Sequence, residues 1–73
     1  MRYEFRVADS VSQALAEAFP ELDRMPVAEQ TVFVGPVIDE AHLFGLLARF
    51  RSLGLSVLEM RQLPGDSTDA PGG

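Results

Sequence analysis

The sequence predicts one small α+β domain with the element order β-α-β-β-α-β. Three observations predict this order. Two segments carry apolar residues at helical spacing, the segments around them alternate or are rich in β-branched residues, and turn-forming residues separate the segments. A chain of 73 residues is long enough for one such domain, which we expect to span residues 1–63.

Residues 2–7 alternate between apolar and charged side chains and are therefore predicted to form a strand with one buried face. The buried side chains of this strand are expected to be Tyr3, Phe5 and Val7. A helix is expected next, because Ser10 suits an N-cap and Gln13 completes a capping box three residues later. Pro20 ends this helix, since proline disfavours helical backbone in the residue before it. The apolar face of the helix is expected to be Val11, Ala14, Leu15, Ala18 and Phe19.

The middle of the chain predicts two more strands. Residues 25–30 are the weaker candidate, because Pro26 lacks an N–H group and suits only an edge strand. Residues 31–34 are the stronger candidate, because they are β-branched or aromatic. The pair Gly35 and Pro36 is expected to end this strand.

A second helix is expected to begin after Asp39, which suits an N-cap, and to end at Gly54, which suits the left-handed residue that closes a helix. The apolar stripe of this helix is expected to be Leu43, Leu46, Leu47, Phe50 and Leu53. A final strand over residues 55–63 is expected to bury Leu58 and Met60 on one face.

Two right-handed crossovers would place both helices on one face of a four-stranded antiparallel sheet, which is the ferredoxin-like arrangement. Beyond the last strand, residues 64–73 contain Ala70 as the only apolar side chain besides proline. Such a segment cannot bury enough surface to offset the entropy of ordering it. We therefore expect residues 64–73 to be a disordered acidic tail.

The composition disfavours several classes of function. The formal net charge is −5 and the six basic residues are scattered arginines, whereas a nucleic-acid binder needs a basic patch. No stretch approaches the roughly 20 apolar residues of a membrane span. The absence of cysteine excludes disulfides, thiolate metal sites and a thiol nucleophile, and it favours a reducing cytoplasm. We expect no nucleic-acid or membrane partner.

The candidate catalytic and metal-binding residues form no recognisable site. His42 is the only histidine, and with Asp39 and Glu40 it supplies fewer than the three or four ligands that a metal site needs on one face. It has no evident serine or acid partner for a hydrolytic triad and is interpreted as a surface histidine in the first helical turn. We therefore expect no catalytic residue, no metal and no cofactor, and the chain is not predicted to be an enzyme.

The second helix suggests an interaction surface. Its core stripe leaves Phe44 on the flank, and Gly45 on the outer surface would allow another chain to approach closely. The alternative is that Phe44 simply completes a small core. If Phe33 points inward, Val32 and Val34 form an apolar strip on the open face of the sheet. The candidate interface is therefore Val32, Val34, Ala41, Phe44, Gly45 and Ala48.

The second half of the chain also resembles a group of small uncharacterised proteins of high-GC bacteria. The resemblance rests on the run from Thr31 to Ala41, including Gly35-Pro36-Val37 before the helix, and on Leu53-Gly54-Leu55 after it. At position 44 the group tends to have histidine, whereas this chain has Phe44 and places its histidine at His42. The resemblance implies a bacterial protein and brings no known activity.

Two hypotheses about function follow. The first is a non-enzymatic protein-interaction module that forms a homodimer or docks on another protein, because so small a domain without disulfide or metal gains stability from assembly. The second is a small-ligand regulatory module of ACT-like topology, which rests on analogy of fold alone.

Overall fold

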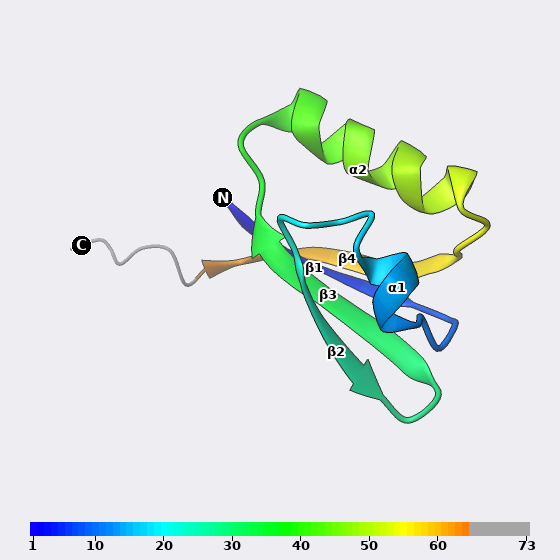
Figure 1. The fold of residues 1–73 in the computed structure, drawn as a ribbon. Coiled ribbons are helices and arrows are strands. Elements are labelled where there is room, and N and C mark those ends of the chain that lie inside the picture. Colours follow the sequence, from blue (N-terminus) through cyan, green and yellow to red (C-terminus); the bar gives the residue numbers. More distant parts are fainter. Residues whose placement is uncertain (65–73) are drawn as a thin grey trace.

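The computed structural model describes residues 1–64, so the expected tail lies outside the described residues from position 65 onward. The elements follow the predicted order. They are β1 (Arg2–Val7), α1 (Gln13–Ala16), β2 (Asp23–Val27), β3 (Gln30–Pro36), α2 (Glu40–Ser52) and β4 (Val57–Leu63). Figure 1 shows α2 crossing above the sheet, with α1 beside the sheet and below the C-terminal end of α2.

The four strands form one antiparallel sheet in the order β2-β3-β1-β4, which confirms the predicted ferredoxin-like arrangement. In the two central strands Phe5 pairs with Phe33, and both rings contact the ring of Phe50 on α2 at 5.3 Å between centroids. The strand that contains Pro26 lies at one edge, as predicted, and β4 lies at the other edge.

The core is a cluster of four phenylalanines from different parts of the chain. Phe19 stacks on Phe50 with 4.2 Å between ring centroids and meets Phe33 at 5.4 Å. All four rings, including that of Phe5, have no exposed surface. Because aromatic pairs add about 0.5–1.5 kcal/mol each beyond the area that they bury, this cluster contributes much of the stability of the domain.

The first helix is shorter than predicted. Its N-cap is Ser12, whose side chain accepts a hydrogen bond from the N–H of Leu15, so the prediction of Ser10 as the cap is wrong. The reason lies in β3, where the buried Thr31 hydroxyl accepts from the N–H of Val11 and donates to the carbonyl of Asp9. These bonds hold the chain before Ser12 against the sheet, and the helix can begin only after it.

The hairpin between β2 and β3 also differs from the prediction. Its turn is Ala28 and Glu29, both with positive φ, whereas the sequence predicted a strand that continues to position 30. A two-residue turn of this kind normally carries Asn or Gly. Since neither residue is present, the sequence contained no signal for it.

The second helix has the predicted ends, whereas the last strand differs from its prediction. Asp39 accepts from the N–H of His42 at 2.9 Å, and Gly54 has a φ of 77°. The expectation that β4 buries Leu58 and Met60 is wrong, because these side chains are 55% and 39% exposed. The strand lies at the sheet edge, and a register shift opposite Arg6 and Val7 interrupts its pairing.

Candidate functional site

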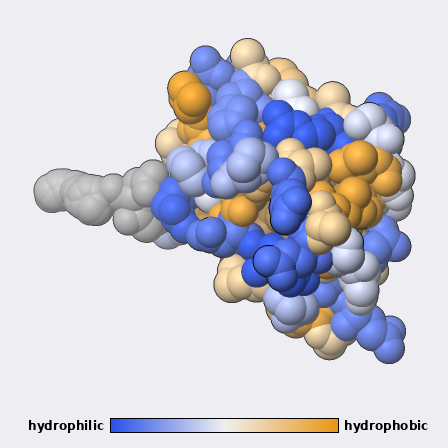
Figure 2. All heavy atoms as spheres, in the orientation of Figure 1, coloured by the Kyte–Doolittle hydropathy of each residue, from blue (hydrophilic) through white to orange (hydrophobic). Residues whose placement is uncertain are grey.

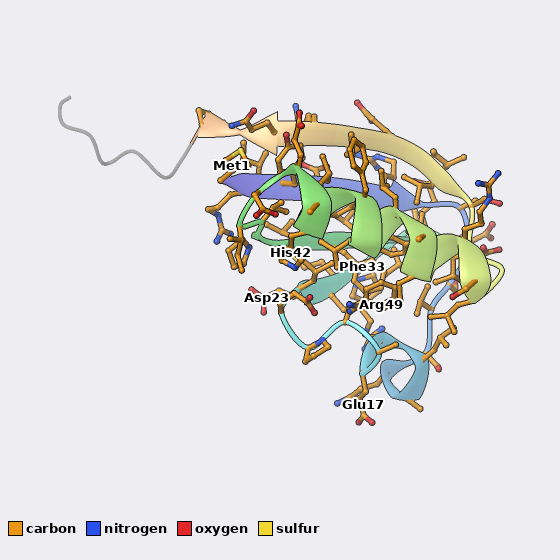
Figure 3. All side chains as sticks on the ribbon, turned by 90° about the horizontal axis from the view of Figure 1, so that it is seen from above. Met1, Glu17, Asp23, Phe33, His42 and Arg49 are labelled. Carbon is orange, nitrogen blue, oxygen red and sulfur yellow. The ribbon has the colours of Figure 1, made fainter. Side chains whose placement is uncertain are left out.

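The two flanks of α2 differ in character. His42 and Arg49 project from one flank toward the loop between α1 and β2, as Figure 3 shows. Phe44 lies two positions after His42, about 200° further around the helix, and therefore on the opposite flank. In Figure 3 this opposite flank faces β4, the strand drawn in orange and yellow. The residues between the two flanks, Leu43, Leu46 and Phe50, are buried in the core.

A polar cluster joins the first of these flanks to the loop. His42 Nε2 lies 3.1 Å from Glu21 Oε2, and Arg49 Nη1 lies 3.4 Å from Glu21 Oε1. The same Arg49 atom donates to the carbonyl of Ala18 at 2.9 Å, and the guanidinium lies 5.5 Å from the centre of the Phe19 ring. This cluster therefore connects α2 to the chain on both sides of Pro20.

The hydrogen bonds of this cluster determine which nitrogen of the neutral His42 ring carries the proton. His42 Nδ1 accepts from the N–H of Ile38 at 3.0 Å, so the neutral ring carries its proton on Nε2 and donates it to Glu21. The hydrogen bond from His42 lowers the pKa of the Glu21 carboxyl, partial burial opposes this shift, and the Arg49 guanidinium lowers the pKa further.

The cluster has the character of a structural tie rather than a reactive site. Both ring nitrogens of His42 and both carboxylate oxygens of Glu21 already have partners. His42 lies in the first turn of α2 as predicted, but the expectation that it has no acid partner is wrong, because Glu21 lies beside it. The sequence could not reveal this pair, since 21 positions and a change of element separate the two residues.

The opposite flank of α2 exposes the large apolar side chain of Phe44, and Arg51 lies two turns further along the same flank. Phe44 is 61% exposed, which excludes the alternative that it completes the core. On the neighbouring edge strand Met60 pairs with Phe5 and so faces the helices, and Leu58 lies at the register shift. We call Phe44, Leu58 and Met60 the β4-side strip. Sequence reasoning missed two of its three members, because it assigned both to the core.

The remaining candidate interface residues divide into two groups. Ala41, Gly45 and Ala48 are exposed on the outer surface of α2. Val32 and Val34 lie on the open face of the sheet, since Phe33 points inward as expected. They are buried there, however, because register places each between a charged β1 side chain and a residue of β2. The structure thus separates the helix candidates from the strand candidates.

The part of the open face formed by β1 and β4 is charged, whereas Met25 and Val27 expose apolar side chains on the part formed by β2. Arg61 Nη2 lies 3.1 Å from Glu4 Oε1, and Arg6 Nε lies 3.5 Å from Glu59 Oε1, so opposite charges face each other across β1 and β4. All six aromatic side chains of the sequence belong to residues 1–64, and none projects from this face. The stacking platform on which ferredoxin-like sheets bind RNA bases is therefore missing here.

A shallow groove of about 480 Å³ lies where α2 meets β4. Its walls are mainly apolar, with Arg51 and Ser56 as the polar side chains, and the lining residues are Leu47, Arg51, Gly54, Leu55, Ser56 and Val57. Figure 2 shows the other side of the domain, where hydrophobic surface lies between the C-terminal end of α2 and α1. Arg51 forms no ion pair within residues 1–64.

Within positions 1–64, no three His, Asp or Glu side chains gather closely enough to hold a metal ion. No helix in that part of the chain combines the length and the apolar character needed to cross a membrane.

Comparison with known proteins gives one match. Residues 2–61 match a family model described as a domain of unknown function, DUF8691. No curated protein and no solved structure matches the chain significantly.

Proposed function

We propose that this chain, which belongs to the DUF8691 family, is a protein-interaction module that binds another protein chain at the β4 side of α2. The observation that carries the proposal is the β4-side strip, Phe44, Leu58 and Met60, which a domain of this size leaves exposed. Exposed apolar side chains that gather on one side of a small domain are typical of interaction sites.

The polar groups of the domain support a role in binding rather than catalysis. The ionisable side chains that come together, on α2 and on the open face, are already paired with one another. A general acid or base needs a free proton-transfer position within reach of a substrate. Among the described residues that line the groove beside Arg51, there is no carboxylate or histidine to transfer a proton. The absence of cysteine suits a reducing compartment, and we place the module in the bacterial cytoplasm.

The proposal is tested with Phe44→Asp in protein purified gently from its own host. Native mass spectrometry should find the wild-type chain in an assembly heavier than its own 8.0 kDa, and the variant as the bare chain. A charge in the middle of an apolar contact should cost about 2 kcal/mol or more of binding free energy. The helix content should not change, because the side chain is exposed.

The matched control is Ile38→Asp. Ile38 is even more exposed, at 81%, but it precedes α2 and lies outside the β4-side strip. This variant should keep the assembly. An assembly that survives Phe44→Asp as well as it survives Ile38→Asp would exclude the strip from the contact.

A small-ligand module is the second candidate, and the groove beside Arg51 favours it. Among the described residues the Arg51 guanidinium forms no ion pair, and a cation next to apolar walls suits a small anion with an apolar part. Saturable thermal stabilisation by members of a panel of amino acids and nucleotides would favour this function. A flat response across the panel would leave the protein-interaction module as the only candidate.

A further inference from the structure

We propose that the partner is a second copy of this chain, which adds its own β4 antiparallel to this one and extends the sheet across both subunits. The inference rests on the proposed function and names its partner and geometry. A two-fold axis perpendicular to the sheet and passing beside Met60 would relate the two copies. Such an axis makes the contact isologous, so each copy offers the same surface to the other.

The opposite edge of the sheet is unsuited to this pairing. In a two-residue hairpin the residues that flank the turn, here Val27 and Gln30, exchange hydrogen bonds, and the pairing alternates from there. The backbone of Pro26, one position further, therefore points away from β3 toward the open edge. Because proline has no N–H, β2 lacks a donor in the middle of its outer side.

The β4 edge has no such protection. The strand Val57–Leu63 contains no proline, and among the described strands it pairs only with β1. The register shift lies near the start of the strand, beside Leu58, and leaves residues 59–63 regularly paired. An edge of this length with exposed apolar side chains is suited to strand addition.

The charges on β4 select one register. Antiparallel pairing about Met60 places Glu59 opposite the partner's Arg61, and Arg61 opposite the partner's Glu59. A shift of the axis to either neighbouring residue would pair Glu59 with its own copy or Arg61 with its own copy. Since opposite charges across strands stabilise and like charges destabilise, the sequence Glu-Met-Arg is complementary to itself only about its centre.

The proposed pairing also extends the existing charge pattern. Glu59 and Arg61 already face Arg6 and Glu4 on β1, and their side chains remain 58% and 62% exposed. The partner's charges would continue this alternation on the far side of β4. Residue Met60, on the other face of the sheet, would meet the partner's Met60 below the two helices.

Figure 3 shows the second helix running alongside β4, and the two elements have similar lengths. The 13 residues of the helix span about 20 Å, and the seven residues of β4 span about 23 Å. The axis perpendicular to the sheet keeps both copies of α2 on the same face, with the Phe44 flank of each turned toward the seam. The β4-side strip would therefore be covered by the same partner that pairs with the strand.

The register is tested with Met60→Cys in the full chain. The natural sequence has no cysteine, so the new thiol is the only one present. Opposed residues in antiparallel strands lie about 4.5–5.5 Å apart at Cα, within the range for a disulfide. Mild oxidation should give a disulfide-linked dimer at least roughly tenfold faster than the control Leu58→Cys, which would face the partner's Gln62 rather than its own copy.

The charge pairing is tested with Glu59→Arg and Arg61→Glu. Each variant alone places like charges opposite each other twice, and its dimer dissociation constant should rise about tenfold or more. Mixed in equal amounts, the two variants should form a heterodimer in which all facing charges are opposite. The contacts of each variant within its own chain are the same before and after mixing, so recovery on mixing reports the seam itself.

The outcomes separate the two proposals. A dimer in sedimentation, with selective cross-linking at position 60 and recovery on mixing, supports both. A dimer that Phe44→Asp dissociates but that shows neither of these signatures overturns the strand pairing and leaves the interaction module intact. A chain that stays monomeric up to about millimolar concentration, while Phe44→Asp still removes a different protein partner, overturns only the second copy as partner.

Discussion

The two sheet edges of this domain differ in the contacts that connect them to α2. Toward β2, side chains and backbone close the structure. The Glu21 carboxylate joins two α2 side chains, the loop packs against Gly35, and Pro26 removes a donor from the edge. The exposed apolar side chains of β2 lie on the open face of the sheet, away from α2. Toward β4, the described residues place apolar side chains at the surface beside α2, without polar ties to the helix.

This difference indicates where the domain is complete and where it is suited to a partner. Polar ties are directional, so they hold α2 over the β2 side in one position. Burial of apolar surface is non-directional, and it is favourable with any partner surface that excludes water. The β2 side therefore serves the fold, and the β4 side remains available for assembly. Three substitutions test this division, and each should leave dimer formation by folded protein unchanged.

The largest effect is expected for Gly35→Ala. A Cβ atom at this position would lie 2.5 Å from the carbonyl oxygen of Glu21 and 2.7 Å from a methyl carbon of Leu22. The backbone on both sides would have to move, and we expect a loss of about 2–3 kcal/mol of unfolding free energy in urea titrations.

The matched control is Gly45→Ala on the outer surface of α2. No atom lies within 4 Å of the Cβ position there, so alanine should stabilise the helix by about 0.5–1 kcal/mol. Equal effects of the two substitutions would contradict the view that the loop of Glu21 and Leu22 is tightly packed against β3.

A smaller effect, in the stabilising direction, is expected for Glu29→Gly in the β2–β3 turn. Glu29 has a φ of 69°, which glycine adopts without the steric cost that a side chain brings. The unfolding free energy should rise by about 1 kcal/mol, as measured by thermal and urea denaturation. An unchanged or lower stability would show that the Glu29 side chain itself contributes to the hairpin.

The smallest effect concerns Glu21→Gln and depends on pH. Because the folded protein holds the pKa of Glu21 below its ordinary value, the carboxylate stabilises the fold at pH values above that ordinary value. The contribution is lost as the pH falls through the lowered pKa of the folded state. Near neutral pH the variant should be less stable by about 0.5–1 kcal/mol, and this difference should shrink in acid.

The exposed carboxylate of Glu17, four positions earlier, provides the control. Glu17→Gln should change stability little at any pH, because Glu17 has no ion pair in the described residues. A pH dependence shared by both variants would point to net charge rather than to the cluster of Glu21, His42 and Arg49.

Local signals predicted much of this fold. Asp39 and Gly54 bound α2 as expected, because capping depends on a few adjacent atoms. The alternation of Tyr3, Phe5 and Val7 indicated which face of β1 is buried. These predictions succeeded because neighbouring residues alone determine the periodicity and the caps.

The errors occur where distant residues decide the local structure. The start of α1 depends on the hydroxyl of Thr31, which is 20 positions from Val11. Leu58 and Met60 have the pattern of buried strand residues, yet they are exposed because their strand is at an edge. Only the order of the strands decides this, and strand order is a property of the whole sheet.

The sequence by itself determined the order of the elements, the apolar face of α2 and the charge pattern of Glu59, Met60 and Arg61 on β4. Only the tertiary structure decided that Glu21 meets His42 and Arg49, and that Phe44, Leu58 and Met60 lie on the same side of the molecule. The physical reason is range. Backbone geometry and capping act within a few residues, whereas burial and ion pairing depend on which distant segments the fold brings into contact.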